Sequence, residues 1–398
     1  MNITSKIVAL SSAEAFALQI ALALLMLRYF SPEEVGVFSV ISQIGFFWTT
    51  VALAQTPLRL LANHGVSVFE DARHAWVSSV QRFVLLLPVA ALAVWWSGLL
   101  FINSLLWALL LSLFQLTWML AQSMRLRMVS VWAQAGVRVL PPLAALLLAS
   151  AAVFVKWSGP SLFVAALLGY AIGAAWLLPA LLFSSPKLHD ASHAPLSTIM
   201  GDDRSATLRM AHTLFDALLA MSIVVMWQRL YGEQETGWMA STLRLIGFVP
   251  AVISMAGSQV MLAKPQISLP RPFIVGIYGF ICVSFLASCY YFACKFGLLD
   301  IKWQGLTPYL LPIVIWQGCS CIAAAYSYLP FQMQKARYYS FICIGGSIIQ
   351  GLNLLAPIWI FERLSAMLHM YWYAISYSIV LLTISWIISK THSKKIQL

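Results

Sequence analysis

Long runs of apolar residues follow one another along almost the whole chain, and only short polar segments separate them. A helix that spans the hydrocarbon core of a bilayer needs about 20 mostly apolar residues, and there is room for about a dozen such helices here. Lipid offers no partner for a backbone N–H or C=O group, so these segments are expected to be helices that bond internally. Since only 9% of the residues are charged, against about 25% in soluble domains, an ordinary soluble protein is excluded.

The pattern predicts an all-α membrane protein with about 12 transmembrane helices. We expect these spans near residues 7–30, 35–61, 83–100, 105–124, 137–154, 161–183, 210–230, 238–261, 273–295, 309–331, 341–361 and 366–388. The polar stretch 63–82 is typical of a short interfacial helix. Pro141 and Pro142 are placed near the start of the fifth span, where proline is tolerated. Pro179 and Pro250 lie inside spans and predict kinks or breaks.

The basic residues indicate how the spans are oriented. If the N-terminus lies in the cytoplasm, most of the 24 Lys and Arg residues fall on the inner side, and the outer side holds Arg28, Lys156, Arg229, Lys295, Lys302 and Arg363. Cytoplasmic loops of membrane proteins carry an excess of Lys and Arg, so this asymmetry predicts that both termini lie inside. The net charge of +11 therefore reflects topology, and nucleic acid is not expected as a partner.

A short polar motif occurs twice. Residues 28–38 read RYFSPEEVGVF and residues 229–239 read RLYGEQETGWM, at an offset of 201 in a chain of 398 residues. Three aligned pairs are identical: Arg28 and Arg229, Glu34 and Glu235, Gly36 and Gly237. Each copy lies between two long apolar segments, so the halves are expected to be a parallel repeat of two six-helix lobes. We expect an N-lobe at 1–183, a cytoplasmic linker at 184–209 and a C-lobe at 210–398.

Three ionisable side chains fall inside predicted spans: Glu14, Asp216 and Arg244. A charged residue at the centre of a spanning helix costs about 2.5–3.5 kcal/mol on insertion scales. Either these groups cross-link helices within the bundle, or they line a water-filled cavity between the lobes. We favour the cavity because the three lie in repeat-related helices: Arg244 aligns with Gln43, and Asp216 lies one position from the register of Glu14.

We expect these groups to have different roles. The planar guanidinium of Arg244 suits phosphate or carboxylate, so it is expected to bind an anionic part of the cargo. Polar neighbours and two arginines at the inner mouth complete the expected substrate-binding set, which is Gln43, Ser39, Ser42, Ser241, Arg59 and Arg138. Glu14 and Asp216 are expected to be ion-coupling sites for a proton or a cation.

The sequence shows few signs of other chemistry. All six cysteines lie in the second half, and we interpret them as apolar core residues rather than disulfides or metal ligands. His189 and His193 have a helical spacing, but nothing nearby completes a metal site. There is no phosphate-binding loop of the form GxxxxGK[ST], and the outer loops are short. We therefore expect no metal, no cofactor, no ATP hydrolysis and no enzymatic activity.

The motif RYFSPEEVGVFSV, which begins at Arg28 between an N-terminal span and a polar second span, resembles the polysaccharide transporter family. These are the Wzx-type flippases of lipid-linked oligosaccharides, within the multidrug/oligosaccharidyl-lipid/polysaccharide exporter superfamily, and they commonly read close to RxLGPEEYGxF at this place. The chain has Phe30 and Ser31 in place of Leu and Gly, and Val35 in place of Tyr. The motif is short, whereas the two-lobe layout covers the whole chain.

The resemblance implies an alternating-access flippase that moves a polyprenyl-pyrophosphate-linked oligosaccharide from the cytoplasmic to the outer leaflet. Spans one, two, seven and eight would line a cationic cavity, in which Arg244 would hold the pyrophosphate or acidic sugars. The implied location is the bacterial cytoplasmic (inner) membrane, and the implied process is the assembly of O-antigen lipopolysaccharide, capsule or exopolysaccharide. Membrane lipid and a proton or sodium counter-ion complete the expected partners.

Two other functions fit the same sequence. A cation-coupled drug or metabolite antiporter of the same superfamily would share the fold and use Glu14 and Asp216 for cationic cargo. An integral-membrane glycosyltransferase or polymerase would act chemically on lipid-linked sugars, but such an enzyme normally needs a sizeable domain on the outer face.

Overall fold

The computed structural model describes residues 3–54, 56–62, 67–128, 130–183, 203–254, 271–332, 335–361 and 364–396. These residues form helices joined by short connections, and no strand occurs among them. Most of the expected linker at 184–209, including His189 and His193, lies outside the described residues. The prediction of an all-α protein is confirmed for the described part of the chain.

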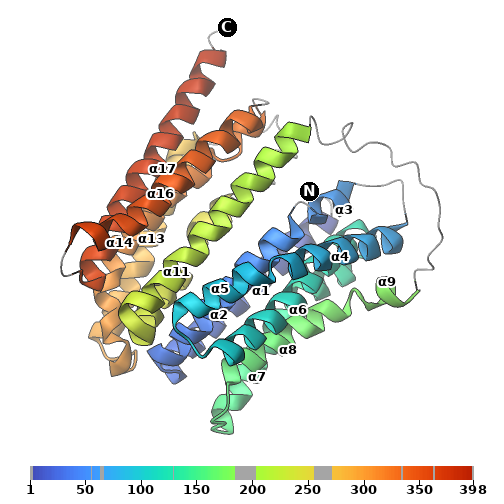
Figure 1. Ribbon diagram of the computed structural model, residues 1–398, viewed down its shortest axis with the longest axis horizontal. Coiled ribbons are helices and arrows are strands. Elements are labelled where there is room, and N and C mark those ends of the chain that lie inside the picture. Colours follow the sequence, from blue (N-terminus) through green and yellow to red (C-terminus); the bar gives the residue numbers. More distant parts are fainter. Residues whose placement is uncertain are drawn as a thin grey trace. The chain divides into compact units, whose positions relative to one another are not determined.

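The helices group into two compact units (Figure 1). The first unit comprises Met1–Phe30, Val37–Asp203 and Val224–Arg229, and the second comprises Ser31–Gly36, Arg204–Ile223 and Leu230–Leu398. The first holds α1 (Ile3–Tyr29), most of α2 (Pro32–Leu53), α3 (Thr56–Ala62), α4 (Val68–Leu85), α5 (Leu87–Ser97), α6 (Phe101–Arg127), α7 (Val131–Phe154), α8 (Ser161–Ala175) and α9 (Leu178–Phe183). The second holds most of α11 (Asp203–Ile246), α13 (Pro272–Lys295), η1 (Ile301–Leu306), α14 (Thr307–Tyr326), α15 (Leu329–Gln332), α16 (Ala336–Ile360) and α17 (Ala366–Ile396).

Each unit has a core of its own. In the first unit, α7 packs on α1 and α8, and α6 contacts α8, α4 and α3. In the second unit, α14 packs on α13 and α17, and α17 also contacts α16. Large aromatic side chains fill both cores: Trp48 and Phe47 in the first, and Trp303 and Tyr309 in the second, are at most 1% exposed.

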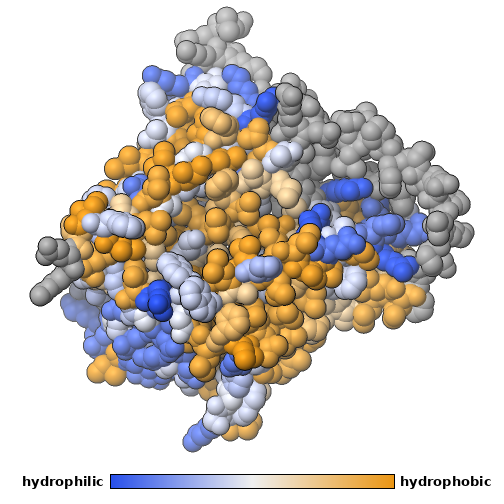
Figure 2. Space-filling view, viewed as in Figure 1, coloured by the Kyte–Doolittle hydropathy of each residue, from blue (hydrophilic) through white to orange (hydrophobic). Residues whose placement is uncertain are grey.

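Eight helices of the described chain are long and apolar enough to cross a membrane, or up to nine if the bent pair of α4 and α5 counts as one span. One of the eight, Thr207–Ser254, is 48 residues long and covers the predicted span at 210–230 and residues 238–254 of the predicted span at 238–261. Figure 2 shows that apolar side chains cover most of the face drawn, as expected for contact with lipid. The chain is therefore a multi-pass membrane protein, while the total of 12 spans stays a prediction.

The helix is interrupted at the same place in both copies of the repeated motif. α1 ends at Tyr29 and α2 begins at Pro32, so Ser31 lies in the break. In the second copy, Gly232 interrupts α11 with φ 84° and ψ −177°, and Gly232 is the residue that aligns with Ser31. Glycine adopts such a conformation readily, whereas other residues are strained there. The sequence repeat is thus also a repeat of the backbone break.

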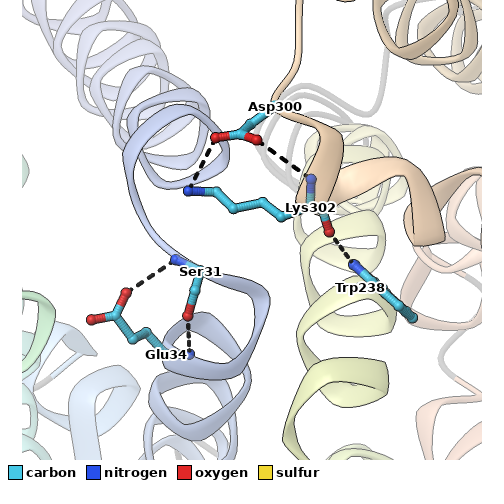
Figure 3. Close-up of polar contacts among 5 residues, drawn as sticks. All are labelled: Ser31, Glu34, Trp238, Asp300 and Lys302. Atoms are coloured by element: carbon cyan, nitrogen blue, oxygen red, sulfur yellow. Dashed lines mark hydrogen bonds and ion pairs between the residues drawn. The ribbon is translucent and has the colours of Figure 1, made fainter.

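The first copy forms its break with a capping box (Figure 3). The Ser31 N–H donates to Glu34 Oε2 at 3.0 Å, and the Glu34 N–H donates to Ser31 Oγ at 3.2 Å. This reciprocal pair satisfies two backbone donors at the start of a helix. Pro32 occupies the first helical position, where its missing N–H costs nothing. Local sequence therefore specifies where α2 starts.

The second copy is held instead by side chains from other helices of its unit. Tyr309 on α14 donates its hydroxyl to Glu235 Oε2 at 2.5 Å. The hydroxyl of Tyr231 lies 2.8 Å from His369 Nδ1 at the start of α17. Glu235 thus binds a tertiary partner, whereas its repeat mate in the first copy caps its own helix.

A further tie joins the second copy to η1 (Figure 3). Trp238 Nε1 donates to the Lys302 carbonyl at 3.0 Å. Asp300 caps η1: its Oδ1 accepts from the Lys302 N–H at 3.4 Å, and its Oδ2 lies 3.4 Å from Lys302 Nζ. That backbone N–H, followed by the Lys302 ammonium, lowers the pKa of Asp300. This half-buried pair fixes the turn on which Trp238 docks.

The two copies of the motif contact each other inside the second unit. A Cβ on Gly36 would meet the carbonyl oxygen of Glu233, and a Cβ on Gly237 would meet the carbonyl oxygen of Pro32. Glu233 aligns with Pro32 at the offset of 201, so these are two equivalent halves of one contact. Such reciprocity is what a local two-fold axis produces. The glycines allow two helix starts to approach backbone to backbone.

The polar stretch that was expected to form a short interfacial helix is part of a longer helical pair. α4 begins at Val68 and bends by 48° into α5. Two contacts hold α4 against α6: Trp76 Nε1 donates to Thr117 Oγ1 at 3.2 Å, and Asp71 Oδ2 lies 2.8 Å from Arg127 Nη1. The polar residues of this stretch are therefore used inside the unit, which composition alone did not indicate.

The placement of Pro141 and Pro142 near a helix start was wrong, because α7 begins at Val131 and both prolines lie inside it. Pro141 lacks the N–H that would bond to the carbonyl of Val137, four residues earlier. Trp118 Nε1 on α6 donates to that carbonyl at 2.7 Å. The indole therefore replaces the donor that the proline removes.

Tryptophan N–H groups bond to free backbone carbonyls at two other helix interruptions. Pro357 inside α16 frees the carbonyl of Asn353, and Trp372 Nε1 on α17 donates to it at 3.2 Å. At the bend between α4 and α5, Trp48 stacks on Phe83 at 4.2 Å between ring centroids and donates to the Phe83 carbonyl at 2.7 Å. Tryptophan side chains thus satisfy backbone acceptors where helices are interrupted.

The breaks predicted at Pro179 and Pro250 are confirmed. α8 ends at Ala175, and α9 begins at Leu178, one residue before Pro179. α11 ends at Ile246, a turn follows, and residues 248–254 are again helical. Proline inside a helix removes one hydrogen bond and clashes with the preceding turn, so a break at these positions is its direct consequence.

Alanine at Gly36 or Gly237 should destabilise the protein, because the new methyl group overlaps a backbone carbonyl. Overpacking of this kind typically costs about 1–3 kcal/mol, so Gly36→Ala and Gly237→Ala should each lower the melting temperature in detergent. The double variant should cost less than the sum of the single variants, because both act on one contact. Gly351→Ala is the control, since nothing lies within 4 Å of its added Cβ. A Gly237→Ala variant as stable as this control would contradict the contact.

Trp118→Phe should destabilise the first unit, because it leaves the Val137 carbonyl without a donor inside an apolar bundle. An unsatisfied buried acceptor costs about 1–3 kcal/mol, measurable as a loss in the free energy of unfolding in detergent. Trp107→Phe on the same helix is the matched control, because Trp107 stacks on Phe163 at 5.2 Å between centroids and phenylalanine keeps an aromatic ring there. An equal loss in both variants would show that ring size, not the hydrogen bond, is responsible.

Candidate functional site

The expected anion contact lies on an apolar helix and is open to its surroundings. Arg244 belongs to α11 in the second unit, and its side chain is exposed. It lies within the apolar stretch Thr207–Ser254. A guanidinium held exposed in such a helix is suited to an anionic group that enters the membrane region.

The polar residues predicted beside it are divided between the units and differ in burial. Gln43 and Ser42 are half-buried on α2 in the first unit. Ser39 and Ser241 are buried, with exposed fractions of 5% and 6%. The predicted polar faces of α2 and α11 are therefore only partly open.

Two predicted mouth residues belong to the first unit, where Arg59 on α3 is exposed and Arg138 on α7 is half-buried. Other arginines of the predicted inner side bind backbone carbonyl groups, which satisfies acceptors left over at helix ends and bends. These bonds run from Arg82 Nε to the Ala52 carbonyl at 2.7 Å, from Arg125 Nη2 to the Trp176 carbonyl at 3.0 Å, and from Arg127 Nη1 to the Leu60 carbonyl at 3.0 Å. Part of the basic excess that we attributed to topology therefore has a structural role.

The two predicted ion-coupling carboxylates have different surroundings. Glu14 on α1 in the first unit is exposed. Asp216 on α11 in the second unit is also exposed, with 56% of its side chain accessible, yet both of its oxygens have partners. Asp216 Oδ2 lies 3.0 Å from His212 Nε2, and Asp216 Oδ1 accepts from Ser347 Oγ at 2.7 Å.

The cluster around Asp216 involves three helices of the second unit. His212 precedes Asp216 by one helical turn on α11, and only 21% of its side chain is exposed. From α16, the ring of Tyr339 meets the imidazole edge to face at 5.9 Å, and Cys343 is close enough to His212 to interact with it electrostatically. Tyr377 from α17 is close enough to Asp216 and Cys343 to interact with them electrostatically. The polar groups form a small cluster within the unit.

Sequence reasoning found Asp216 but missed His212 and Ser347. The i, i+4 spacing of His212 and Asp216 places both on one face of a helix, and that signal was available in the sequence. Ser347 is 131 residues away on α16, and only the tertiary fold of the second unit brings it to Asp216. No group of three or more potential metal-ligating His, Cys, Asp or Glu side chains forms within the described residues.

No protein-family model matches this chain. No curated protein matches it by sequence either.

Solved structures do match it over nearly its full length. A multidrug resistance MATE family transporter of the MOP superfamily, in an inward-facing conformation, aligns with a TM-score of 0.64 and 11% identity over 99% of this chain and 96% of that one. The lipid II flippase MurJ, in an inward closed conformation, gives 0.61 and 11% identity over 97% and 87%. The MATE multidrug transporter DinF-BH gives 0.60 and 13% identity over 97% and 95%. The chain therefore has the fold that these MATE transporters and MurJ share.

Proposed function

We propose that this protein is an alternating-access flippase that moves a polyprenyl-pyrophosphate-linked oligosaccharide from the cytoplasmic to the outer leaflet. Its role would be in the assembly of O-antigen lipopolysaccharide, capsule or exopolysaccharide, in the bacterial inner membrane. Two findings support this proposal. The fold is shared with a protein named a lipid II flippase, and the repeated motif resembles the Wzx-type polysaccharide transporters.

The observation that carries the proposal is the exposed Arg244 on an apolar helix. A pyrophosphate that crosses a membrane must exchange its hydration shell for fixed donors, and a guanidinium forms bidentate, charge-assisted hydrogen bonds with phosphate oxygens. Cationic cargo would be repelled at this point. Gln43, aligned with Arg244 in the repeat, would offer a neutral amide to the glycan or phosphate from α2. Arg59 and Arg138 would attract the anionic headgroup at the inner mouth.

The proposed architecture has 12 spans in two six-helix lobes, with both termini in the cytoplasm. The N-lobe would occupy 1–183 and the C-lobe 210–398, joined by an inner linker at 184–209. The shared break at Ser31 and Gly232 supports this arrangement, because it gives the first two spans of each half the same form. The cargo would bind between the first two spans of each lobe.

A cation-coupled antiporter is the second candidate, and the exposed carboxylates favour it. Glu14 and Asp216 are both accessible, and two solved transporters with this fold are described as multidrug transporters. The two candidates differ in which charged residue is essential for binding cargo. An antiporter of organic cations would need the carboxylates and tolerate the loss of Arg244.

Arg244→Ala should strongly reduce export of the polymer in a strain whose own copy of the gene is deleted. Loss of a hydrogen bond to a charged partner costs about 1.5–3 kcal/mol, which corresponds to roughly tenfold to a hundredfold weaker cargo binding. The effect is measured at equal protein levels as the amount of polymer on the cell surface and the amount of lipid-linked precursor that is not exported. Arg244→Lys should retain part of the activity, because it keeps the charge but not the planar fork.

Arg271→Ala is the matched control, since Arg271 is an exposed arginine of the same unit just before α13. This variant should export polymer normally. Full export by Arg244→Ala at normal expression would refute the assignment of Arg244. Loss of export with Arg271→Ala as well would point to a general effect of surface charge.

A further inference from the structure

We propose that the ion coupled to transport is a proton, and that the paired side chains of His212 and Asp216 carry it. This inference rests on the proposed function, because it names the counter-ion of the same transport cycle. It assigns a specificity-determining role to His212, and a positioning role to Ser347. The coupled ion would therefore bind in the second unit, and not at Glu14 in the first unit.

The geometry around Asp216 is that of an oriented histidine and carboxylate pair. His212 Nε2 lies 3.0 Å from Asp216 Oδ2, one helical turn away on α11. Ser347 Oγ donates to the other oxygen at 2.7 Å from α16, which fixes the plane of the carboxylate. The pair is enclosed on the histidine side, where 21% of the side chain is exposed, and open on the aspartate side, where 56% is exposed. A proton could therefore reach the pair from water at Asp216.

The ligands near Asp216 suit a proton better than sodium. Hard cations bind several oxygen atoms at once, whereas imidazole nitrogen and thiol sulfur suit softer metals. One Asp216 oxygen faces an imidazole nitrogen, and the next group beyond that imidazole is the Cys343 thiol. Ser347 supplies the only other side-chain oxygen seen to bond Asp216 within the described residues. A sodium ion would have to displace the imidazole to gain ligands.

The remaining ionisable groups that face the pair are one thiol and two phenols. They are Cys343 and Tyr339 on α16 and Tyr377 on α17. Arg209 precedes His212 by three residues on α11, where its carbonyl accepts from Thr213 Oγ1 at 3.0 Å. Histidine is the residue type in this cluster whose ordinary pKa lies nearest neutral pH.

Proton uptake by the pair balances as follows. When His212 is neutral with its proton on Nδ1, its Nε2 faces the Asp216 carboxylate and the pair carries one negative charge. A proton from water that enters at the exposed Asp216 carboxylate and passes to Nε2 gives an imidazolium beside a carboxylate, and the net charge becomes zero. Release of that proton on the opposite side of the membrane restores the starting state. A neutral pair costs less than a charged one in an apolar bundle, so protonation biases the unit between two states.

His212→Gln tests this role, because glutamine can still donate to Asp216 but cannot carry a proton. The full-length protein in liposomes should move a fluorescent lipid-linked oligosaccharide faster under an imposed pH gradient, and an equal sodium gradient should have no effect. His212→Gln should abolish the response to the pH gradient. His74→Gln, at an exposed histidine on α4, should behave as the wild type. A response to sodium alone, or a full pH response in His212→Gln, would overturn the proposal.

A second measurement does not depend on the cargo. The melting temperature of the purified protein should vary with pH in choline chloride, and replacement of choline by sodium should leave it unchanged, since a bound ion stabilises the folded state. His212→Gln should flatten the pH dependence, whereas Ser347→Ala should shift its midpoint. Stabilisation by sodium, or an unchanged pH profile in His212→Gln, would overturn the proton assignment. If no lipid-linked glycan moves but these melting profiles hold, the proposed function fails and the proton site stands.

Discussion

The structure depends on one constraint, which is that lipid supplies no hydrogen bond to a backbone carbonyl. A helix satisfies this constraint until proline or a bend interrupts it. At Pro141 and Pro357 the freed acceptors are Val137 O and Asn353 O, and indole N–H groups from neighbouring helices bond to both. A third indole bonds to the Phe83 carbonyl where α4 bends into α5. Tryptophan side chains therefore stabilise the interrupted helices, because their indole N–H groups bond to the backbone carbonyls that the interruptions leave free.

The repeat shows how one architecture can be reached by two different sets of side chains. Ser31 and Gly232 occupy equivalent positions, but a capping box forms the first break and a positive φ angle forms the second. The reciprocal contact of Gly36 and Gly237 retains the two-fold relation at the backbone. The side chains of α1 and α11 differ further, because Asp216 has a histidine and a serine partner, whereas Glu14, one position out of register with it, has neither in the described part of the chain. The two halves therefore share the position of the backbone break and differ in their polar side chains.

The spanning helices and the breaks between them could largely be predicted from the sequence, because they depend on residues that are close together along the chain. Apolar length predicts spanning helices, and an offset of 201 between two short motifs predicts where both halves break. The bend between α4 and α5 and the interior position of Pro141 depend on contacts with Thr117, Trp48 and Trp118, which lie on other helices. Sequence patterns do not contain such contacts. Asp216 could be singled out by its rarity in an apolar segment, whereas Ser347 becomes its partner only through tertiary packing.

The fold is that of MATE transporters and of MurJ, and the cargo that we propose is a polyprenyl-pyrophosphate-linked oligosaccharide. The most direct test of this cargo uses the purified protein in liposomes and measures how fast a fluorescent polyprenyl-pyrophosphate-linked oligosaccharide exchanges between the leaflets. A membrane-impermeant quencher reports how much label has reached the outer leaflet. We expect the protein to accelerate this exchange and the organic cation ethidium not to compete. No acceleration over protein-free liposomes, together with transport of ethidium, would contradict this expectation.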